Sequence, residues 1–168
     1  MKSEMEANEK FVVLLRHGIA EPHGARENDD ERVLTATGAR RMKQIGRGLA
    51  KVFPKAEVIY TSPLIRCEQT AKRVAKAYGP ATPMETADAL KPGTDPDDIR
   101  SLITSSEARH IICVGHEPSL SAAMLAITKM SSDGAIELRK GGCYGVRLLA
   151  DGGARLEWML RPRILRRG

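Results

Sequence analysis

The sequence predicts an α/β domain, a three-layer sandwich in which helices cover both faces of a mostly parallel central sheet. Apolar runs of strand length alternate with helical segments through most of the chain, an order that favours parallel strands. The run F-V-V-L-L at 11–15 is apolar at every position, as expected for a strand covered on both faces. Two alternating segments near the C-terminus, joined by the turn D-G-G, predict an antiparallel hairpin at one side of the sheet.

The first half of the chain predicts two strands, each followed by a helix. The polar segment 24–32 after the first strand is interpreted as a loop. Thr35 is placed to cap a helix that runs to about Val52 and stops before Pro54. The next elements are a strand at Glu57–Tyr60 and a helix with Ser62 as its cap, Pro63 in its first turn and Gly79 at its end.

The second half predicts two more helices and the remaining strands. In order these are a short strand and loop within Pro80–Pro92, a helix capped by Asp95 with Pro96 in its first turn, a strand at His110–Val114, a helix from near Pro118, and strands at Gly141–Leu149 and Arg155–Leu160. A single domain is therefore expected at 11–160. Residues 1–10 are predicted to be a mobile arm, and the basic tail 161–168 is predicted to be frayed and without a function.

The composition narrows the classes of function. The 168 residues include 27 Lys and Arg against 21 Asp and Glu, a net charge of +6, and only 4% are aromatic. So small an excess, with so few rings for base stacking, favours a solvated surface over nucleic-acid binding. The three cysteines form no disulfide framework and no C-x-x-C zinc signature. Neither a signal peptide nor an apolar run of about 18 residues is recognised, so we expect a cytoplasmic protein with no membrane span.

Cationic and imidazole side chains follow three of the predicted strands where those strands end. They are Arg16 and His17 after the first strand, Ser62 and Arg66 after the second, and Gly115 and His116 after the strand at 110–114. In such sheets ligands bind outside the carboxyl ends of the strands, so we expect these residues to converge there. Guanidinium groups match phosphate oxygens, and an imidazole can attack phosphorus. The pattern therefore predicts a phosphate site suited to phosphoryl transfer.

Three motifs carry a resemblance to a known family. R-H-G after the first strand, S-P-L-I-R-C-E-Q-T-A after the second and V-G-H-E-P-S-L after a later strand resemble the histidine phosphatase superfamily. The segments L-T-A-T-G-A, G-H-E-P and I-E-L-R-K-G-G, together with the short length, resemble its SixA-type phosphohistidine phosphatase branch. The likeness spans roughly residues 11 to 160. It implies the fold of that superfamily, which is phosphoglycerate-mutase-like.

The resemblance implies a role for each matched residue. His17 would be the nucleophile that becomes phosphohistidine, and Gly18 would keep its loop close. The Gly18 backbone or a neighbouring carbonyl would fix the tautomer of the His17 ring. Neither a metal nor another cofactor would be required. The phosphoryl group would be bound by Arg16, Arg66 and His116, with lesser hydrogen bonds from Ser62 and from the amide of Gly115 or His116.

Two positions depart from the pattern of phosphoglycerate mutases and many small-molecule phosphatases of the superfamily. Those proteins carry R-H-G-E, whereas Ile19 stands in the fourth place here. They also carry an acid that protonates the leaving group, but 91–93 reads K-P-G in that place, and Glu85 and Asp88 are the acids nearby. A phosphoramidate with a protonated nitrogen leaves more readily than an alkyl ester. The missing acid therefore predicts phosphohistidine, or another activated phosphate, as the substrate. A chain too short for a lid favours a protein over a small sugar phosphate, so we expect phosphohistidine in a signalling or phosphotransfer protein.

Several alternatives stay open. A phosphatase for a small phosphate ester or nucleotide, or a catalytically weak phosphate-binding module, would carry a similar site. Nucleic-acid binding through the basic tail ranks below both. His23, six residues after His17, is a candidate for the mouth of the site, whereas His110 and Lys140 are interpreted as structural and surface residues. A monomer is compatible with the sequence, which does not fix the oligomeric state.

Overall fold

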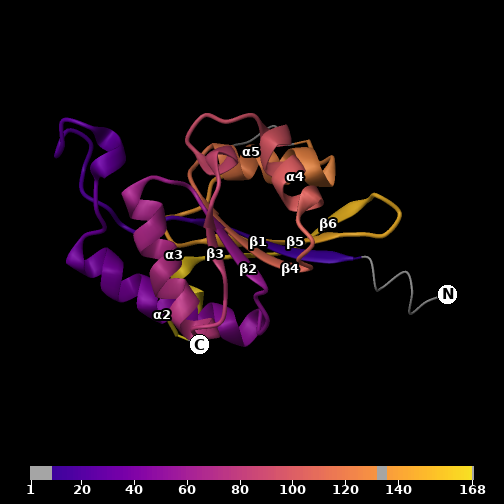
Figure 1. Ribbon diagram of the computed structural model, residues 1–168, viewed down its shortest axis with the longest axis horizontal. Coiled ribbons are helices and arrows are strands. Elements are labelled where there is room, and N and C mark those ends of the chain that lie inside the picture. Colours follow the sequence, from indigo (N-terminus) through magenta and orange to yellow (C-terminus); the bar gives the residue numbers. More distant parts are fainter. Residues whose placement is uncertain (1–8, 132–135, 168) are drawn as a thin grey trace.

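A computed structural model describes residues 9–131 and 136–167, which form one six-stranded sheet between two layers of helices (Figure 1). The strands are β1 (Lys10–Arg16), β2 (Val58–Thr61), β3 (Met84–Thr86), β4 (His110–Gly115), β5 (Cys143–Leu148) and β6 (Ala154–Leu160). They lie in the order β3-β2-β4-β1-β5-β6. The first four are parallel, whereas β5 pairs antiparallel with both β1 and β6. The predicted mostly parallel sheet with a C-terminal hairpin is confirmed.

The helices divide between the two faces of the sheet. They are α2 (Ala36–Val52), α3 (Ile65–Tyr78), α4 (Pro96–Ser105), α5 (Ser119–Thr128) and α6 (Pro162–Leu165), with short 3-10 turns η1 (Asp29–Glu31) and η2 (Asp88–Leu90). Figure 1 shows α2 and α3 on one face and α4 and α5 on the other. Val13 and Leu15 of β1 pack into the core beneath α2 and α3, and Val12 and Leu14 pack beneath α4 and α5. The uninterrupted apolar run of β1 is explained by these two cores.

Two of the predicted helix caps are confirmed and one is wrong. The Thr35 hydroxyl accepts a hydrogen bond from the Gly38 amide, and the Asp95 carboxylate accepts one from the Asp97 amide. The helix predicted to be capped by Ser62 begins later, at Ile65, and its cap residue makes no side-chain hydrogen bond to the helix. The Ser62 hydroxyl instead contacts the His116 imidazole and accepts a hydrogen bond from the amide of Leu64, the residue before the helix.

Both predicted ends of the domain need correction where the structure describes them. Lys10 is the first residue of β1, whereas 1–8 of the expected arm lies outside the described residues. The tail is not frayed over α6, because the Leu165 side chain is buried in the core beneath α2. A Cβ atom at Gly48 of α2 would lie 1.8 Å from the Leu165 carbonyl oxygen, so glycine allows this close contact. The tail is therefore held against the domain.

Two smaller differences concern loops. The segment expected to be a plain loop at 24–32 contains the η1 turn. The segment Pro80–Pro92 contains the expected short strand, β3, and in addition the η2 turn. Among the described helices, none is long and apolar enough to cross a membrane.

Candidate active site

The residues predicted to converge do meet at the carboxyl edge of the sheet. The His17 amide donates to the Gly115 carbonyl at 3.0 Å, which ties the end of β1 to the end of β4. The Ser62 amide donates to the Val114 carbonyl at 2.9 Å, which ties the end of β2 to the same strand. Arg66 follows in the first turn of α3. We call the site formed by Arg16, His17, Arg66 and His116 the histidine pocket.

His17 is held in one tautomer by its own loop. Its side chain is buried, and its Nδ1 lies 2.8 Å from the Gly18 carbonyl oxygen, which can only accept a proton. Nδ1 therefore carries the hydrogen and Nε2 carries the lone pair. The Gly18 amide donates to the Thr70 hydroxyl at 3.0 Å, and a Cβ at Gly18 would lie 2.5 Å from the Met42 side chain. The loop that orients the imidazole is fixed on both sides.

His116 is oriented by two side chains that follow β2. Its Nε2 lies 2.9 Å from the Ser62 hydroxyl and 3.3 Å from the Cys67 sulfur. Because the Ser62 oxygen also accepts a hydrogen bond from the Leu64 amide, its own proton is free to be donated to Nε2. Burial raises the pKa of the Cys67 thiol to about 12, so it keeps its proton, which it can donate to Nε2 or to the Gly115 carbonyl at 3.7 Å. This arrangement favours the tautomer with its hydrogen on Nδ1.

Both imidazoles are neutral at physiological pH. Burial, followed by the nearby charges of Arg66, Arg16 and Lys140, lowers the pKa of His17 to about 3, although the Gly18 carbonyl partly opposes this. Burial, followed by the nearby charges of His17 and of Arg66, Arg16 and Arg32, lowers the pKa of His116 to about 3 as well. The two ring centroids are 5.2 Å apart. The pocket thus offers one imidazole lone pair beside one imidazole N–H donor.

The two arginines supply the positive charge of the pocket, and each is anchored by one acid. The buried Arg66 guanidinium donates to the Asp29 carbonyl at 2.9 Å and lies 3.3 Å from the Asp29 carboxylate. Arg16 pairs with Glu137 at 2.7 Å. The Nε–H of each arginine is buried without a hydrogen-bond partner among the described residues. Unpaired buried donors are rare in proteins, and oxygens of a bound anion would supply the acceptors they lack.

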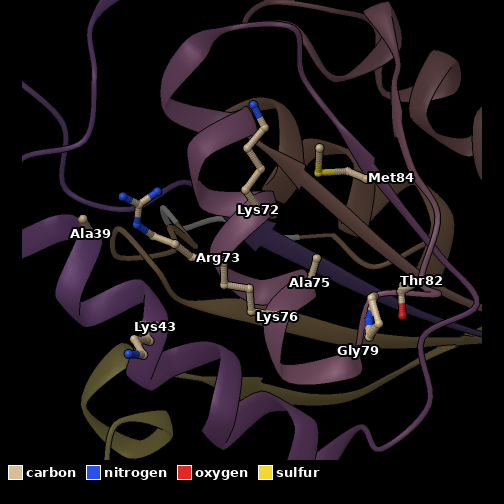
Figure 2. A pocket seen from close by; sticks show the side chains of 10 residues that line it. Ala39, Lys43, Lys72, Arg73, Ala75, Lys76, Gly79, Thr82 and Met84 are labelled. Atoms are coloured by element: carbon tan, nitrogen blue, oxygen red, sulfur yellow. The ribbon is translucent and has the colours of Figure 1, made fainter.

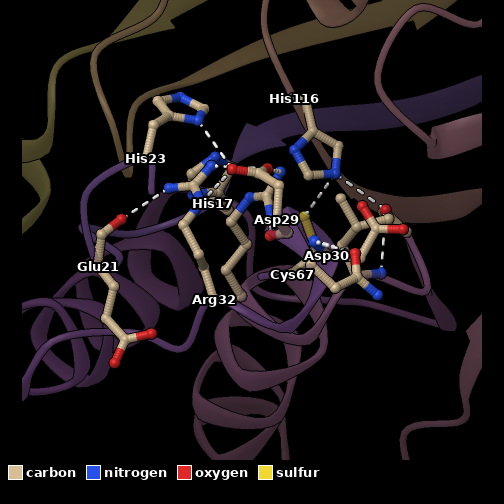
Figure 3. A network of polar contacts seen from close by, with 12 residues as sticks. His17, Glu21, His23, Asp29, Asp30, Arg32, Cys67 and His116 are labelled. Carbon is tan, nitrogen blue, oxygen red and sulfur yellow. Dashed lines mark hydrogen bonds and ion pairs between the residues drawn. The ribbon is translucent and has the colours of Figure 1, made fainter. Parts of the chain in front are cut away.

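Sequence reasoning missed the polar network on the loop after β1 (Figure 3). Asp29 binds Arg66 and also pairs with Arg32 at 2.7 Å and with His23 at 2.8 Å. Arg32, His23 and Arg66 together lower the pKa of Asp29 to about 2. The segment reads as a charged loop, and no spacing within it indicates that Asp29 meets a helix residue so far along the chain. Thr70 and Cys67 were also missed, although both lie within the motif after β2.

The lower-ranked candidates lie at the edge of the pocket or away from it. His23 is largely exposed and reaches the pocket only through Asp29. Glu85 is exposed on β3, and the exposed Asp88 pairs with Lys91 at 3.0 Å. Lys140 is exposed, as a surface lysine should be, yet lies close enough to His17 to lower its pKa. Neither predicted acid makes a described contact with the histidine pocket.

Two further residues, Glu117 and His110, lie outside the histidine pocket. Glu117 accepts hydrogen bonds from the Ser121 amide and from the Leu138 amide at 2.8 Å. It thereby tethers the segment whose Leu138 carbonyl accepts a hydrogen bond from Arg16. His110, interpreted as structural, lies 3.7 Å from Glu57 at the opposite end of β4. No three metal-binding side chains converge within the described residues, and the absence of a metal requirement stays a prediction.

A cavity of about 880 Å³ lies elsewhere, between α2 and α3 (Figure 2). Cations such as Lys43, Lys72 and Arg73 line it, but none of the four residues of the histidine pocket does. This cavity is therefore not part of the histidine pocket.

Comparison with known proteins identifies the family. The model of the histidine phosphatase superfamily (branch 1) matches residues 12–92, which contain the first two motifs. An uncharacterised protein of Picosynechococcus sp. is 31% identical over 150 residues, covering 87% of this chain and 88% of that protein. The chain belongs to the histidine phosphatase superfamily. The family and the paired imidazoles and arginines of the pocket together support a histidine-dependent phosphatase.

Two solved structures show how widely the superfamily fold is shared. The protein histidine phosphatase SixA complexed with tungstate matches with a TM-score of 0.80 at 20% identity, covering 92% of this chain and 99% of that one. A phosphoglycerate mutase from Plasmodium falciparum matches with a TM-score of 0.69 at 18% identity, covering 89% of each chain. The predicted phosphoglycerate-mutase-like fold is confirmed.

Proposed function

We propose that this phosphatase hydrolyses phosphohistidine in a protein through a covalent intermediate on His17. The observation that carries the proposal is the neutral His17 ring, whose Nδ1–H is held by the Gly18 carbonyl so that Nε2 keeps its lone pair. The cations Arg16 and Arg66 flank that ring. A buried neutral imidazole with one fixed tautomer is a nucleophile that needs no deprotonation before it attacks.

The first half of the reaction transfers the phosphoryl group to the protein. Nε2 of His17 forms a bond to phosphorus while the bond from phosphorus to the substrate imidazole breaks. The electron pair of that bond returns to the substrate nitrogen, whose ring is neutral on departure because its other nitrogen was protonated beforehand. Arg16, Arg66 and the Nδ1–H of His116 stabilise the charge on the equatorial oxygens.

The second half restores the free protein. A water molecule attacks the phosphorus of the His17 intermediate, the bond from phosphorus to Nε2 breaks, and inorganic phosphate leaves. The same cationic groups stabilise the second transition state, because the charge on the transferred phosphoryl group is similar in both steps.

None of the described acids near the pocket is well suited to protonate a leaving group, which supports an activated phosphoramidate as the substrate. Asp29 contacts Arg66, but its pKa of about 2 keeps it ionised, so it is a poor proton donor for an alkoxide leaving group. Glu85 and Asp88 are exposed, and Asp88 pairs with Lys91. A phosphohistidine substrate arrives with its leaving imidazole protonated and does not need this donor. The likeness to SixA, a protein histidine phosphatase, supports the same choice.

A direct comparison of substrates tests the proposal. The protein would be incubated with a histidine-phosphorylated phosphotransfer protein and, in parallel, with p-nitrophenyl phosphate, with His17→Ala as control. We expect loss of phosphohistidine that depends on His17 and little release of nitrophenol. Brisk turnover of the ester would contradict the proposal and indicate an acid not identified above. Turnover of neither would favour a phosphate-binding module.

A small phosphate ester is the second candidate, because a phosphoglycerate mutase shares the fold and, by its name, acts on a small phosphorylated molecule. A cytoplasmic location, a monomeric state and the absence of nucleic-acid binding stay predictions.

A further inference from the structure

A second cavity, of about 230 Å³, borders the histidine pocket at Gly18. It lies between α2, the segment before β5 and the C-terminal α6, and no acidic residue is among the described residues that line it. Six cationic side chains line this basic cavity: Arg41, Arg139, Lys140, Arg161, Arg163 and Arg166.

The charges of the basic cavity are not neutralised by the residues that the structure describes. Within the residues that the structure describes, none of the six side chains forms an ion pair, in contrast to Arg16 and Arg66 of the histidine pocket. The Nε–H of Arg166 is buried and has no hydrogen-bond partner there. Like charges held together without counter-charges repel one another, so an anionic ligand would be attracted to them.

The basic cavity is joined to the histidine pocket by the backbone beside the nucleophile. Gly18 lines the cavity, and Lys140 lines it while lowering the pKa of His17. The Gly141 amide donates to the carbonyl oxygens of both Arg16 and His17 at 3.1 Å. A protein that presents phosphohistidine to His17 would therefore place its neighbouring surface over these cations.

We propose that the basic cavity binds acidic side chains that surround the phosphohistidine of the protein substrate. The inference rests on the proposed function and adds the kind of surface that the phosphatase recognises. Four of the six cations are exposed, namely Arg139, Lys140, Arg161 and Arg163. Long exposed side chains suit a broad carboxylate-bearing surface better than a small anion, which needs donors that enclose it. Guanidinium groups pair with carboxylates bidentately and also steer association.

The packing of α6 gives this surface a fixed place. Leu165 is buried beneath α2 and its carbonyl lies against Gly48, so the arginines around it are held beside the pocket. The segment expected to be a tail without a function thereby becomes one wall of the docking site.

A charge reversal tests the inference. The variant is Arg161→Glu with Arg163→Glu, and the matched control is Lys129→Glu with Arg155→Glu, two exposed cations outside the basic cavity. KM and kcat would be measured with a histidine-phosphorylated phosphotransfer protein and with free phosphohistidine. We expect the variant to raise KM for the protein about tenfold at low salt, with kcat and the turnover of free phosphohistidine nearly unchanged. The control should behave as the native protein does.

A binding measurement separates this inference from the proposed function. Fluorescence anisotropy with a labelled poly-glutamate peptide should show binding to the native protein and its loss in the Arg161→Glu, Arg163→Glu variant. If the native protein binds the peptide at this cavity but does not hydrolyse phosphohistidine, the proposed function fails while acidic docking stands.

Three results would overturn the docking inference. One is an unchanged KM for the phosphorylated protein in the charge-reversal variant. Another is an equal loss of free phosphohistidine turnover, which would make the basic cavity part of the phosphate site. The third is binding of a single-stranded oligonucleotide at this cavity in place of the peptide.

Discussion

The histidine pocket and the basic cavity lie side by side and carry the same sign of charge, but they differ in burial. Arg66, His17 and His116 are buried, and hydrogen bonds to residues that follow β1 and β2 hold them in place, namely Asp29, Gly18 and Ser62. The cations of the basic cavity are mostly exposed and have no described ion pairs. Electrostatic interactions are stronger where water is excluded. We therefore assign phosphoryl transfer to the histidine pocket and partner recognition to the basic cavity.

The largest expected effect is that of a substitution in the buried histidine pocket. Arg66→Ala removes a buried guanidinium from the transferred phosphoryl group, and kcat/KM for phosphohistidine should fall on the order of 100- to 1000-fold. Arg73→Ala, on the same helix but lining the other cavity, is the matched control and should leave kcat/KM nearly unchanged. Equal effects of the two substitutions would contradict the role of Arg66.

The fixed loop of the pocket is tested by Thr70→Val. Removing the hydroxyl leaves the Gly18 amide without its acceptor, so the free energy of unfolding should fall by about 1–3 kcal/mol. Because the loop orients His17, kcat should fall on the order of tenfold or more. Thr104→Val on α4 removes a hydroxyl that bonds only within its own helix and serves as the control. A stability loss without any change in kcat would show that Thr70 does not position the nucleophile.

The salt concentration should affect binding at the basic cavity more than binding at the histidine pocket. Raising the salt concentration from about 0.05 M to about 0.5 M screens exposed charges more than buried ones. KM for a histidine-phosphorylated protein should therefore rise several-fold, whereas KM for free phosphohistidine should change less. Steady-state kinetics over a salt series measures both. A parallel rise for the two substrates would remove the distinction between the pocket and the cavity.

The last expected effect concerns stability against pH. The folded protein lowers the pKa of His17 and His116 to about 3, so below the ordinary value of 6.5 the unfolded chain takes up protons that the folded protein does not. The stability that these rings contribute is present above pH 6.5 and is lost as the pH falls toward 3. Each ring contributes a slope of up to about 1.4 kcal/mol per pH unit.

Urea titrations of the native protein and of His116→Gln between these pH values measure that slope. The variant should show the smaller slope, because one of the two titrating rings is gone. Identical slopes would mean that the folded protein does not hold His116 neutral.

The convergence of the motifs was predictable because it follows from topology. Parallel strands bring their carboxyl ends to one edge, so residues after β1, β2 and β4 had to meet once the sheet was recognised. The support from Asp29 was not predictable, because it joins Arg66 to a residue 37 positions away within a charged loop. The packing of α6 against α2 was not predictable from the sequence for a similar reason. One buried leucine within a basic segment leaves little periodic signal, and its partner Gly48 is remote in sequence.

The central proposal is that the phosphoryl group is transferred to His17 before it is released as inorganic phosphate. The native protein would be mixed with a histidine-phosphorylated protein, quenched in alkali at early times, digested and mapped by mass spectrometry. We predict a transient phosphoryl group on His17 and none on His116, His23 or His110, with no phosphorylated peptide from His17→Ala. Turnover of the substrate with no phosphoenzyme at any time, or with phosphate on another residue, would contradict the account.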